Sequence, residues 1–200
     1  QERLKCPRPN VTIAGQSAPG GGICISGANI YIHSKNFIVR YIRFRAGALS
    51  GSNYSALGIE NTENIIIDHC SFSWSMEENV TMYDNKYTTM QWCILSEPLY
   101  VSKHDKGARG YGAQWGGEHS TFHHNLFANH ESRNHLFASV DGTKWVDYRN
   151  NVVYNWGFKT AYVGGHHAEI NMVNNYYKPG PASQHHRLLD VAEDGTGRYY

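Results

Sequence analysis

The stretch that decides the fold runs from Asn64 to Asn79 and reads N-I-I-I-D-H-C-S-F-S-W-S-M-E-E-N. Its β-branched block Ile65–Ile67 favours a strand, in which the first and third isoleucines share one side. Beyond His69 the apolar positions are Cys70, Phe72 and Trp74, which have the opposite parity. Because a strand cannot exchange its buried side without a break, the sequence predicts a corner near His69.

The same strand-corner-strand unit recurs along the chain. Aligning the corners gives six equivalent residues: Ile42, Cys70, Cys93, Asn125, Asn151 and Asn175. Their successive separations are 28, 23, 32, 26 and 24 residues. Repeats of about 20 to 50 residues indicate a solenoid, and strand-rich repeats of this length suit the coils of a parallel β-helix. The prediction is therefore an all-β chain forming a single β-helix domain over residues 1–200.

The aligned corner residues also predict how the coils are held together. Asn125, Asn151 and Asn175 should form a ladder, because asparagine tolerates left-handed backbone and its amide can bond to neighbouring coils. Cys70 and Cys93 should stack ~4.8 Å apart, which permits a disulfide but favours a pair of small buried apolar residues.

Composition excludes some partners. The net charge is +1 and no basic run is present, so no nucleic-acid partner is expected. No apolar run is long enough to cross a membrane. The chain begins at Gln1, which is compatible with a removed signal peptide and a secreted, periplasmic or cell-surface location. No amphipathic helix is present to cap either end, so we expect a monomeric segment of a longer β-helix.

The widest separation, between Cys93 and Asn125, indicates an inserted loop over Glu97–Gly117. Insertions in solenoids cluster on one face, which is commonly the binding face. The loop carries three cations, Lys103, Lys106 and Arg109, with the aromatic residues Tyr111 and Trp115 beside them. Cations among aromatic rings suit an anionic sugar. The alternative is a solvated loop with ordinary surface charge.

Three carboxylates, Asp68, Glu77 and Glu78, lie within eleven residues and could bind calcium through their oxygens. A serine hydrolase is not indicated, because no G-x-S-x-G motif occurs. A zinc site is not indicated either. His123 and His124 are adjacent on a strand and should point to opposite sides, and no H-E-x-x-H motif is present.

The chain resembles the bacterial calcium-dependent pectate lyases in three motifs: I-I-I-D-H-C-S-F-S-W-S, F-H-H-N-L-F followed by S-R-N, and R-N-N-V-V-Y-N-W-G. N-V-T-I-A-G-Q-S-A-P-G and N-N-Y-Y-K-P-G-P extend the resemblance from Asn10 to about Pro181. It implies a right-handed parallel β-helix and a lyase that cleaves polygalacturonate, with Ca²⁺ as its cofactor.

The resemblance also implies site residues. Asp68 matches a calcium-binding aspartate, and the next two acidic ligands should fall between Ser75 and Asn79, where the carboxylates present are Glu77 and Glu78. Spacing leaves open which residues of that segment bind the metal, so the metal candidates are Asp68, Glu77, Glu78 and Asn79.

Arg133 matches the arginine credited as the catalytic base, although His135 and Leu136 stand where the family often has a proline and a second arginine. Lys106 matches a substrate-binding lysine. The remaining substrate-binding candidates are Lys103, Arg109, Trp115 and His123. Two coils should separate the acids from Arg133, which places them ~10 Å apart along the axis.

The implied reaction is β-elimination, in which a base removes H5 and the 4-linked sugar leaves. Calcium on the adjacent carboxylate would stabilise the charge that develops. One alternative is a glycoside hydrolase, which needs two carboxylates facing one bond, whereas Glu77 and Glu78 are adjacent and expected to point apart. The other is a non-catalytic carbohydrate-binding or adhesin β-helix.

Overall fold

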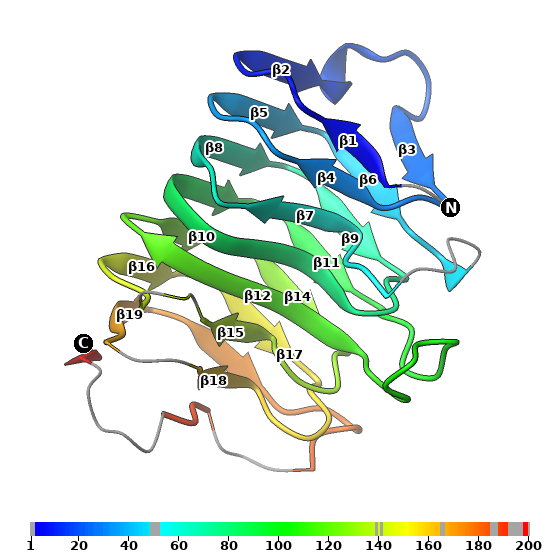
Figure 1. The fold of residues 1–200 in the computed structure, drawn as a ribbon. Coiled ribbons are helices and arrows are strands. Elements are labelled where there is room, and N and C mark those ends of the chain that lie inside the picture. The colour runs from blue at the N-terminus through cyan, green and yellow to red at the C-terminus, as the bar shows by residue number, and fades with distance from the viewer. Residues whose placement is uncertain are drawn as a thin grey trace.

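The computed structural model describes residues 3–48, 53–138, 140, 142–164, 167–184, 188–191 and 198–199. These residues form a solenoid whose coils stack in chain order from the N-terminal end to the C-terminal end (Figure 1). The strands pair in parallel between successive coils and line three faces of the solenoid. The prediction of an all-β parallel β-helix is therefore confirmed.

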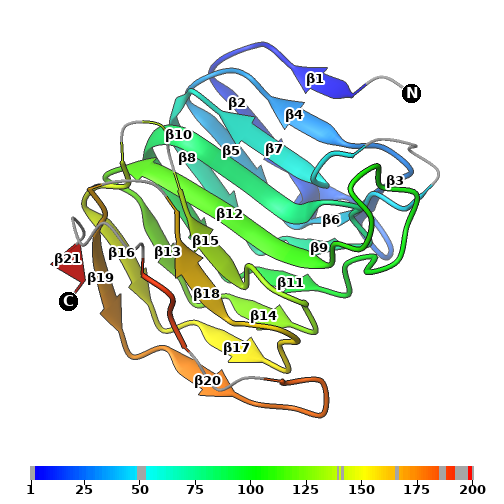
Figure 2. The same cartoon turned by 60° about the horizontal axis from the view of Figure 1, so that its bottom comes forward.

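Figure 2 shows the face that matters most for function, here called the first face. It consists of β1 (Leu4–Cys6), β4 (Ile30–Ile32), β7 (Leu57–Glu60), β10 (Glu78–Gln91), β12 (Tyr111–Glu118), β15 (His135–Phe137) and β18 (Ala161–Val163). The second face consists of β2 (Val11–Ala14), β5 (Phe37–Arg40), β8 (Glu63–Asp68), the last part of β10, β13 (Thr121–His123), β16 (Val146–Arg149), β19 (Glu169–Val173) and β21 (Arg198–Tyr199).

The third face consists of β3 (Ile23–Ser26), β6 (Ile42–Arg45), β9 (Ser71–Ser73), β11 (Ile94–Ser96), β14 (Leu126–Ala128), β17 (Val152–Tyr154) and β20 (Tyr176–Lys178). The only helical element in the described ranges is a short 3₁₀ turn, η1 (Gly15–Ser17). No described helix is long and apolar enough to cross a membrane.

Strand β10 belongs to two faces, because it turns a corner without a break in strand structure. Its first part pairs with β7 and β12, and its last part pairs with β8 and β13. Asp84 and Tyr87 have φ angles of 53° and 52°, in the left-handed region, where the strand bends. The two ends of β10, Glu78 and Gln91, therefore lie on different faces.

The core lies inside the coils. Ile65 and Ile67 are fully buried whereas Ile66 is 39% exposed, as the alternation predicted. Equivalent side chains stack between coils, as Phe44 and Phe72 do with ring centroids 4.8 Å apart. The prediction that Trp74 continues the buried side is wrong. Its left-handed backbone, with φ 65°, begins the next corner and leaves the side chain half exposed.

The corner between the second and third faces confirms the predicted column of equivalent residues. The residue before each of them is left-handed, with φ between 51° and 56°: Tyr41, His69, Trp92, His124, Asn150 and Asn174. Within the column, Asn125 Nδ2 donates to Asn151 Oδ1 and Asn151 Nδ2 donates to Asn175 Oδ1, each at 3.1 Å. Cys70 and Cys93 are buried free thiols, as expected.

The corner between the third and first faces varies most in length. It includes Ser96–Tyr111, which projects as the green loop between β11 and β12 (Figures 1 and 2). The segments that lead into β10, β15 and β18 cross the same corner and carry Glu77, Arg133 and Lys159. Chemistry-bearing side chains therefore gather along one edge of the solenoid.

Candidate active site

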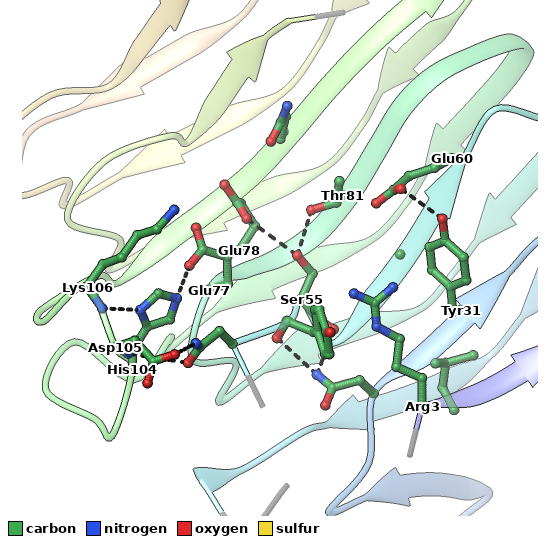
Figure 3. Close-up of a pocket in the computed structure, with 16 residues that line it drawn as sticks. Arg3, Tyr31, Ser55, Glu60, Glu77, Glu78, Thr81, His104, Asp105 and Lys106 are labelled. Carbon is green, nitrogen blue, oxygen red and sulfur yellow. Dashed lines mark hydrogen bonds and ion pairs between the residues drawn. The ribbon is translucent and has the colours of Figure 1, made fainter. Parts of the chain in front are cut away.

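A cavity of about 440 Å³ lies over the first face. Outward-facing side chains of β4, β7 and β10 line it, together with the segments that enter this face. Figure 3 shows Glu77 and Glu78 between His104 and Lys106 on one side and Ser55 and Thr81 on the other. The cavity therefore brings together residues from six separate stretches of the chain.

The two glutamates form a carboxylate pair. Glu78 is the first residue of β10 and its side chain is 3% exposed, while the side chain of Glu77 is 16% exposed. Both reach Arg133, whose Nη1 contacts Glu78 Oε1 and lies 3.8 Å from Glu77 Oε1. The expectation that they point apart is wrong, because Glu77 precedes the strand and is not bound by its alternation.

Hydrogen-bond donors, one of them a guanidinium, surround Glu77. Two nitrogens of the Arg109 guanidinium bind its carboxylate: Nε donates to Oε2 at 2.9 Å and Nη2 contacts Oε1. His104 Nε2 contacts the same carboxylate. The backbone N–H of Lys106 donates to His104 Nδ1 at 3.0 Å, which fixes the tautomer that donates through Nε2.

Arg133 is held by aromatic residues as well as by acids. Its Cζ atom lies 4.3 Å from the ring centroid of Tyr111, and Arg109 Cζ lies 4.4 Å from the same centroid. Tyr162, from β18, makes a side-chain hydrogen bond with Arg133. The guanidinium is thus fixed in position before any ligand binds.

Burial and charge shift the pKa values of this centre. Burial raises the pKa of Glu78, and the nearby Glu77 adds to this effect, so the pKa stays above its usual value despite the opposing effect of Arg133. Burial alone lowers the pKa of Arg133, but Glu78 and Tyr162 outweigh it and the net pKa is raised. Arg133 is therefore a cation as long as Glu78 is its partner.

The distance predicted between the acids and Arg133 is too long. The register places Glu78 beside Tyr111, and Tyr111 beside Ser132, so the two residues do stand two coils apart. However, their long side chains extend toward each other and meet. The sequence predicted the two-coil separation correctly, but it did not predict the direct ion pair between Glu78 and Arg133.

Asp68 does not belong to this centre. It ends β8 on the second face, where it pairs in register with Gln91 at the far end of β10 from Glu78. Its carboxylate is buried and bonded to Arg40 Nε at 2.6 Å, His69 Nδ1 at 2.6 Å and Gln91 Nε2 at 3.0 Å. The prediction that Asp68 shares a metal site with Glu77 and Glu78 is therefore wrong. The ten-residue step from Asp68 to Glu78 crosses the third face of the coil.

Three other candidates also lie elsewhere. Asn79 points into the core, where its amide bonds to Ser75 Oγ, Ser96 O and His130 Nε2, so it is not a metal ligand here. Trp115 is fully buried and stacks on Phe122, so it cannot contact a polysaccharide. His123 ends β13 on the second face, paired with Gln91 and distant from the cavity.

The two lysines of the inserted loop are separated by the structure. Lys106 lines the cavity opposite Ser55 and is exposed (Figure 3). Lys103 is exposed but does not line it. Arg109 lies at the centre, with a side chain 13% exposed. The structure thus brings together Arg133, Lys106, Arg109, Glu77 and Glu78.

Several residues of the site had no signal in the sequence motifs. Tyr162 and Lys159 line a second cavity of about 410 Å³, which shares Arg109, Tyr111 and Arg133 with the acid centre. Registering β12, β15 and β18 on one face would have been needed to find them, because Tyr162 pairs with Leu136 and lies fifty-one residues past Tyr111 in the chain.

The donor chemistry fits a hard divalent cation, but the number of donors does not fill its shell. Glu77 and Glu78 bring two carboxylates to one wall, and Asp105 lines the same cavity. Among the described residues, no group of three or more histidine, cysteine, aspartate or glutamate side chains is arranged to hold a metal. Calcium takes about six to eight oxygen ligands, so further oxygens must come from water or substrate.

No protein-family model matches the chain. Curated relatives do. The chain is 35% identical over 176 residues to a probable pectate lyase C of Aspergillus flavus, and 35% identical over 178 residues to one of Aspergillus fumigatus. Each match covers 86% of the chain, and 39% and 40% of the respective relative. A probable pectate lyase C of Neosartorya fischeri is 34% identical over 178 residues.

The chain resembles pectate lyases. The relatives are fungal, so they support the pectate lyase resemblance and not its bacterial qualifier. One solved structure, reported for the substrate specificity and the anti β-elimination mechanism of pectate lyase, matches this chain with a TM-score of 0.60 and 17% sequence identity. At this identity the match supports the fold alone. It is matched over 98% of this chain and 58% of its own. The chain spans about two fifths of the curated relatives' length.

Proposed function

We propose that this chain forms the catalytic region of a calcium-assisted pectate lyase. The observation that carries the proposal is the direct contact of Arg133 with Glu78, beside Glu77, which Arg109 binds. Both glutamates also line a cavity with Lys106. This arrangement gathers a base candidate, two cation-binding carboxylates and anion-binding side chains around the two glutamates. The similarity to probable pectate lyases over 86% of the chain supports the same reaction.

In this proposal Lys106 and Arg109 bind the carboxylates of a polygalacturonate chain. Lys106 is exposed to an incoming anion. The planar fork of Arg109 suits carboxylates but holds Glu77 in this structure, so it would bind a substrate carboxylate in exchange for Glu77. Glu77 and Glu78 would hold the calcium ion. A bound ion would neutralise the substrate carboxylate next to C5 and stabilise the charge that develops there.

Arg133 removes the proton from C5. The electrons of the C5–H bond form the C4–C5 double bond, the C4–O4 bond breaks, and the leaving oxygen takes a proton from water. In the free protein Arg133 is a poor base, because Glu78 raises its pKa. A cation held by Glu78 would remove this partner from Arg133, and the burial of the guanidinium, which lowers its pKa, would then favour the neutral form that accepts the proton.

The position of the carboxylates argues against a glycoside hydrolase. A hydrolase of this kind places two carboxylates on either side of a glycosidic bond. Glu77 and Glu78 approach Arg133 from the same wall and are neutralised by Arg109 and Arg133. They do not flank a common space as an acid and a nucleophile would.

The test is the absorbance of the product. The full-length protein, incubated with polygalacturonate and calcium, should release oligosaccharides with an unsaturated terminal uronate that absorbs in the ultraviolet. A hydrolase would release reducing ends without this absorbance, and a binding module would release neither. Either of those results contradicts the proposal. Secretion and a monomeric state remain predictions, to be checked by cell fractionation and sedimentation.

A further inference from the structure

The cavity that contains the acid pair continues along the solenoid axis to a second group of polar and aromatic side chains. Arg3, Tyr31, Tyr54 and Glu60, here called the distal cluster, line its far end (Figure 3 labels three of them). This end is the N-terminal side of the same groove. Neither the sequence motifs nor the proposed chemistry uses any of these residues.

The register fixes how far the distal cluster lies from the acid pair. Tyr31 of β4 pairs with Gly58 of β7, and Gly58 pairs with Thr81 of β10, so these residues form one outward column. Two coil steps at ~4.8 Å each separate Tyr31 from Thr81 by ~10 Å. Ser55 connects Thr81 to the acid pair, with Oγ 2.6 Å from Thr81 Oγ1 and 3.4 Å from Glu78 Oε2.

Gly58 keeps the groove open between the two ends. A Cβ atom on Gly58 would lie 2.8 Å from Cδ2 of Tyr31, which is closer than packed carbon atoms approach. The Tyr31 ring therefore lies against the backbone of Gly58. A larger residue would push this ring into the space above the floor of the groove.

The distal cluster is already arranged to receive a ligand. The Arg3 guanidinium lies 4.9 Å from the ring centroid of Tyr31 and 3.2 Å from that of Tyr54. The Tyr31 hydroxyl donates to Glu60 Oε2 at 2.8 Å. Asn29 Nδ2 donates to the backbone carbonyls of Tyr54 and Ser55 at 2.9 and 2.8 Å, which fixes that segment. Tyr54 is nevertheless 44% exposed.

These groups match the chemistry of a uronic acid. An exposed aromatic ring covers the apolar face of a pyranose, a guanidinium binds its carboxylate, and a carboxylate accepts its hydroxyl groups. A pyranose with its linkage is about as long as one coil step. A chain lying along the groove would therefore place one sugar at the acid pair and another about two sugars away at the distal cluster.

We propose that the distal cluster is a subsite for a galacturonate residue remote from the cleaved bond. The Arg3 guanidinium binds the uronate carboxylate, the Tyr54 ring stacks on the sugar, and Glu60 accepts its hydroxyls. This rests on the proposed function, because it names a further binding position for the same polymer. A substrate long enough to reach the cluster gains affinity that a short one lacks.

The test compares hexagalacturonate with trigalacturonate as substrates of the full-length protein. Tyr54→Ala and Arg3→Gln should each lower the ratio of kcat/KM for the hexamer to that for the trimer by about tenfold, equivalent to about 1.4 kcal/mol. The matched controls Tyr176→Ala and Arg8→Ala remove exposed side chains outside the groove and should keep the wild-type ratio. Circular dichroism checks that each variant is folded.

Calorimetry of hexagalacturonate on the Arg133→Ala background separates this proposal from the proposed reaction. Weaker hexamer binding on adding Tyr54→Ala supports the subsite, even if no unsaturated product is ever formed. A wild-type protein that makes the unsaturated product, with the same hexamer-to-trimer ratio in the Tyr54→Ala and Arg3→Gln variants, overturns the subsite and leaves the lyase proposal standing.

Discussion

At the scale of single residues, Arg133 is the side chain on which the proposed chemistry depends most. It contacts Glu78, packs on Tyr111 and bonds to Tyr162, so its position is determined from three sides. Such a side chain can act either as a base or as a binder of the substrate carboxylate. The two roles make different kinetic predictions.

If Arg133 removes H5, Arg133→Ala should lower kcat by about 10²- to 10⁴-fold, as loss of a general base does. Arg133→Lys keeps the charge but loses the planar fork and should be nearly as impaired. Steady-state kinetics on polygalacturonate measure both. A lysine variant with near-normal kcat and a raised KM would make Arg133 a binding residue instead.

The carboxylate pair makes a second prediction. Chelation should abolish the activity, and Glu77→Gln and Glu78→Gln should each raise the calcium concentration needed for half-maximal rate by about tenfold or more, because each removes a charged ligand. Calcium titration by calorimetry measures the same effect without turnover. Asp68→Asn is the informative comparison. If this folded variant needs as much extra calcium as Glu78→Gln, Asp68 belongs to the metal site after all.

At the scale of elements, the sequence predicted the repeating coils, but it did not predict which face of the solenoid each strand occupies. The alternation of Ile65 and Ile67 and the corner at Cys70 are local patterns, so they could be found in a single coil. Which of three faces a strand occupies depends on the lengths of all three corners. This is why Asp68 and Glu78, ten residues apart, were assigned to one site although a whole face lies between them.

The direct ion pair of Arg133 and Glu78 was missed for a related reason. Register gives the positions of backbones, not the direction in which long side chains extend. Trp115 shows the same limit. In the sequence it lies among loop cations, but in β12 it follows Gln114, which lines the cavity, so alternation turns this ring into the core.

The asparagine ladder makes a prediction about stability. Asn151 is fully buried: its Nδ2 donates to Phe122 O at 2.9 Å and to Asn175 Oδ1, and its Oδ1 accepts from Asn125. Asn151→Ala leaves these groups unpaired and should lower the free energy of unfolding by about 3 kcal/mol.

The matched control for the ladder is Asn171→Ala. Asn171 is partly buried, and within the described ranges its side chain makes one hydrogen bond, to Asp147 at 3.2 Å, so its removal should cost about 1 kcal/mol or less. Urea unfolding compares the two variants. Equal losses would mean that the ladder contributes no more than an ordinary side-chain hydrogen bond.

At the scale of the whole molecule, buried histidines predict how stability changes with pH. His135 is fully buried, and neither ring nitrogen has a hydrogen-bond partner among the described residues. Burial lowers the pKa of His135 to about 3 and that of His130 to about 4. The unfolded chain therefore binds more protons than the folded one below the ordinary histidine pKa of about 6.5.

Stability should accordingly be fully present above pH ~6.5 and fall as the pH drops toward the folded pKa values, with about 3 kcal/mol lost by pH 4 through His135 alone. In His135→Leu, the free energy of unfolding should depend less steeply on pH, with a slope smaller by about one proton. The free energy of unfolding at pH 7 should stay the same or rise. Urea unfolding between pH 4 and 7 measures both, with the exposed His33→Leu as control. An unchanged pH slope in His135→Leu would show that His135 is not the titrating group.

The corner between the third and first faces has a consequence for how such a protein can change. Its connections carry Glu77, Arg109 and Arg133, while the amide ladder of Asn125, Asn151 and Asn175 lies at another corner, between the second and third faces. Lengthening a flexible connection costs only about 0.6 kcal/mol for each doubling of its length. Stretches such as Glu97–Gly110 are therefore modular. They can be exchanged for other sequences while the stacked coils beneath them stay as they are.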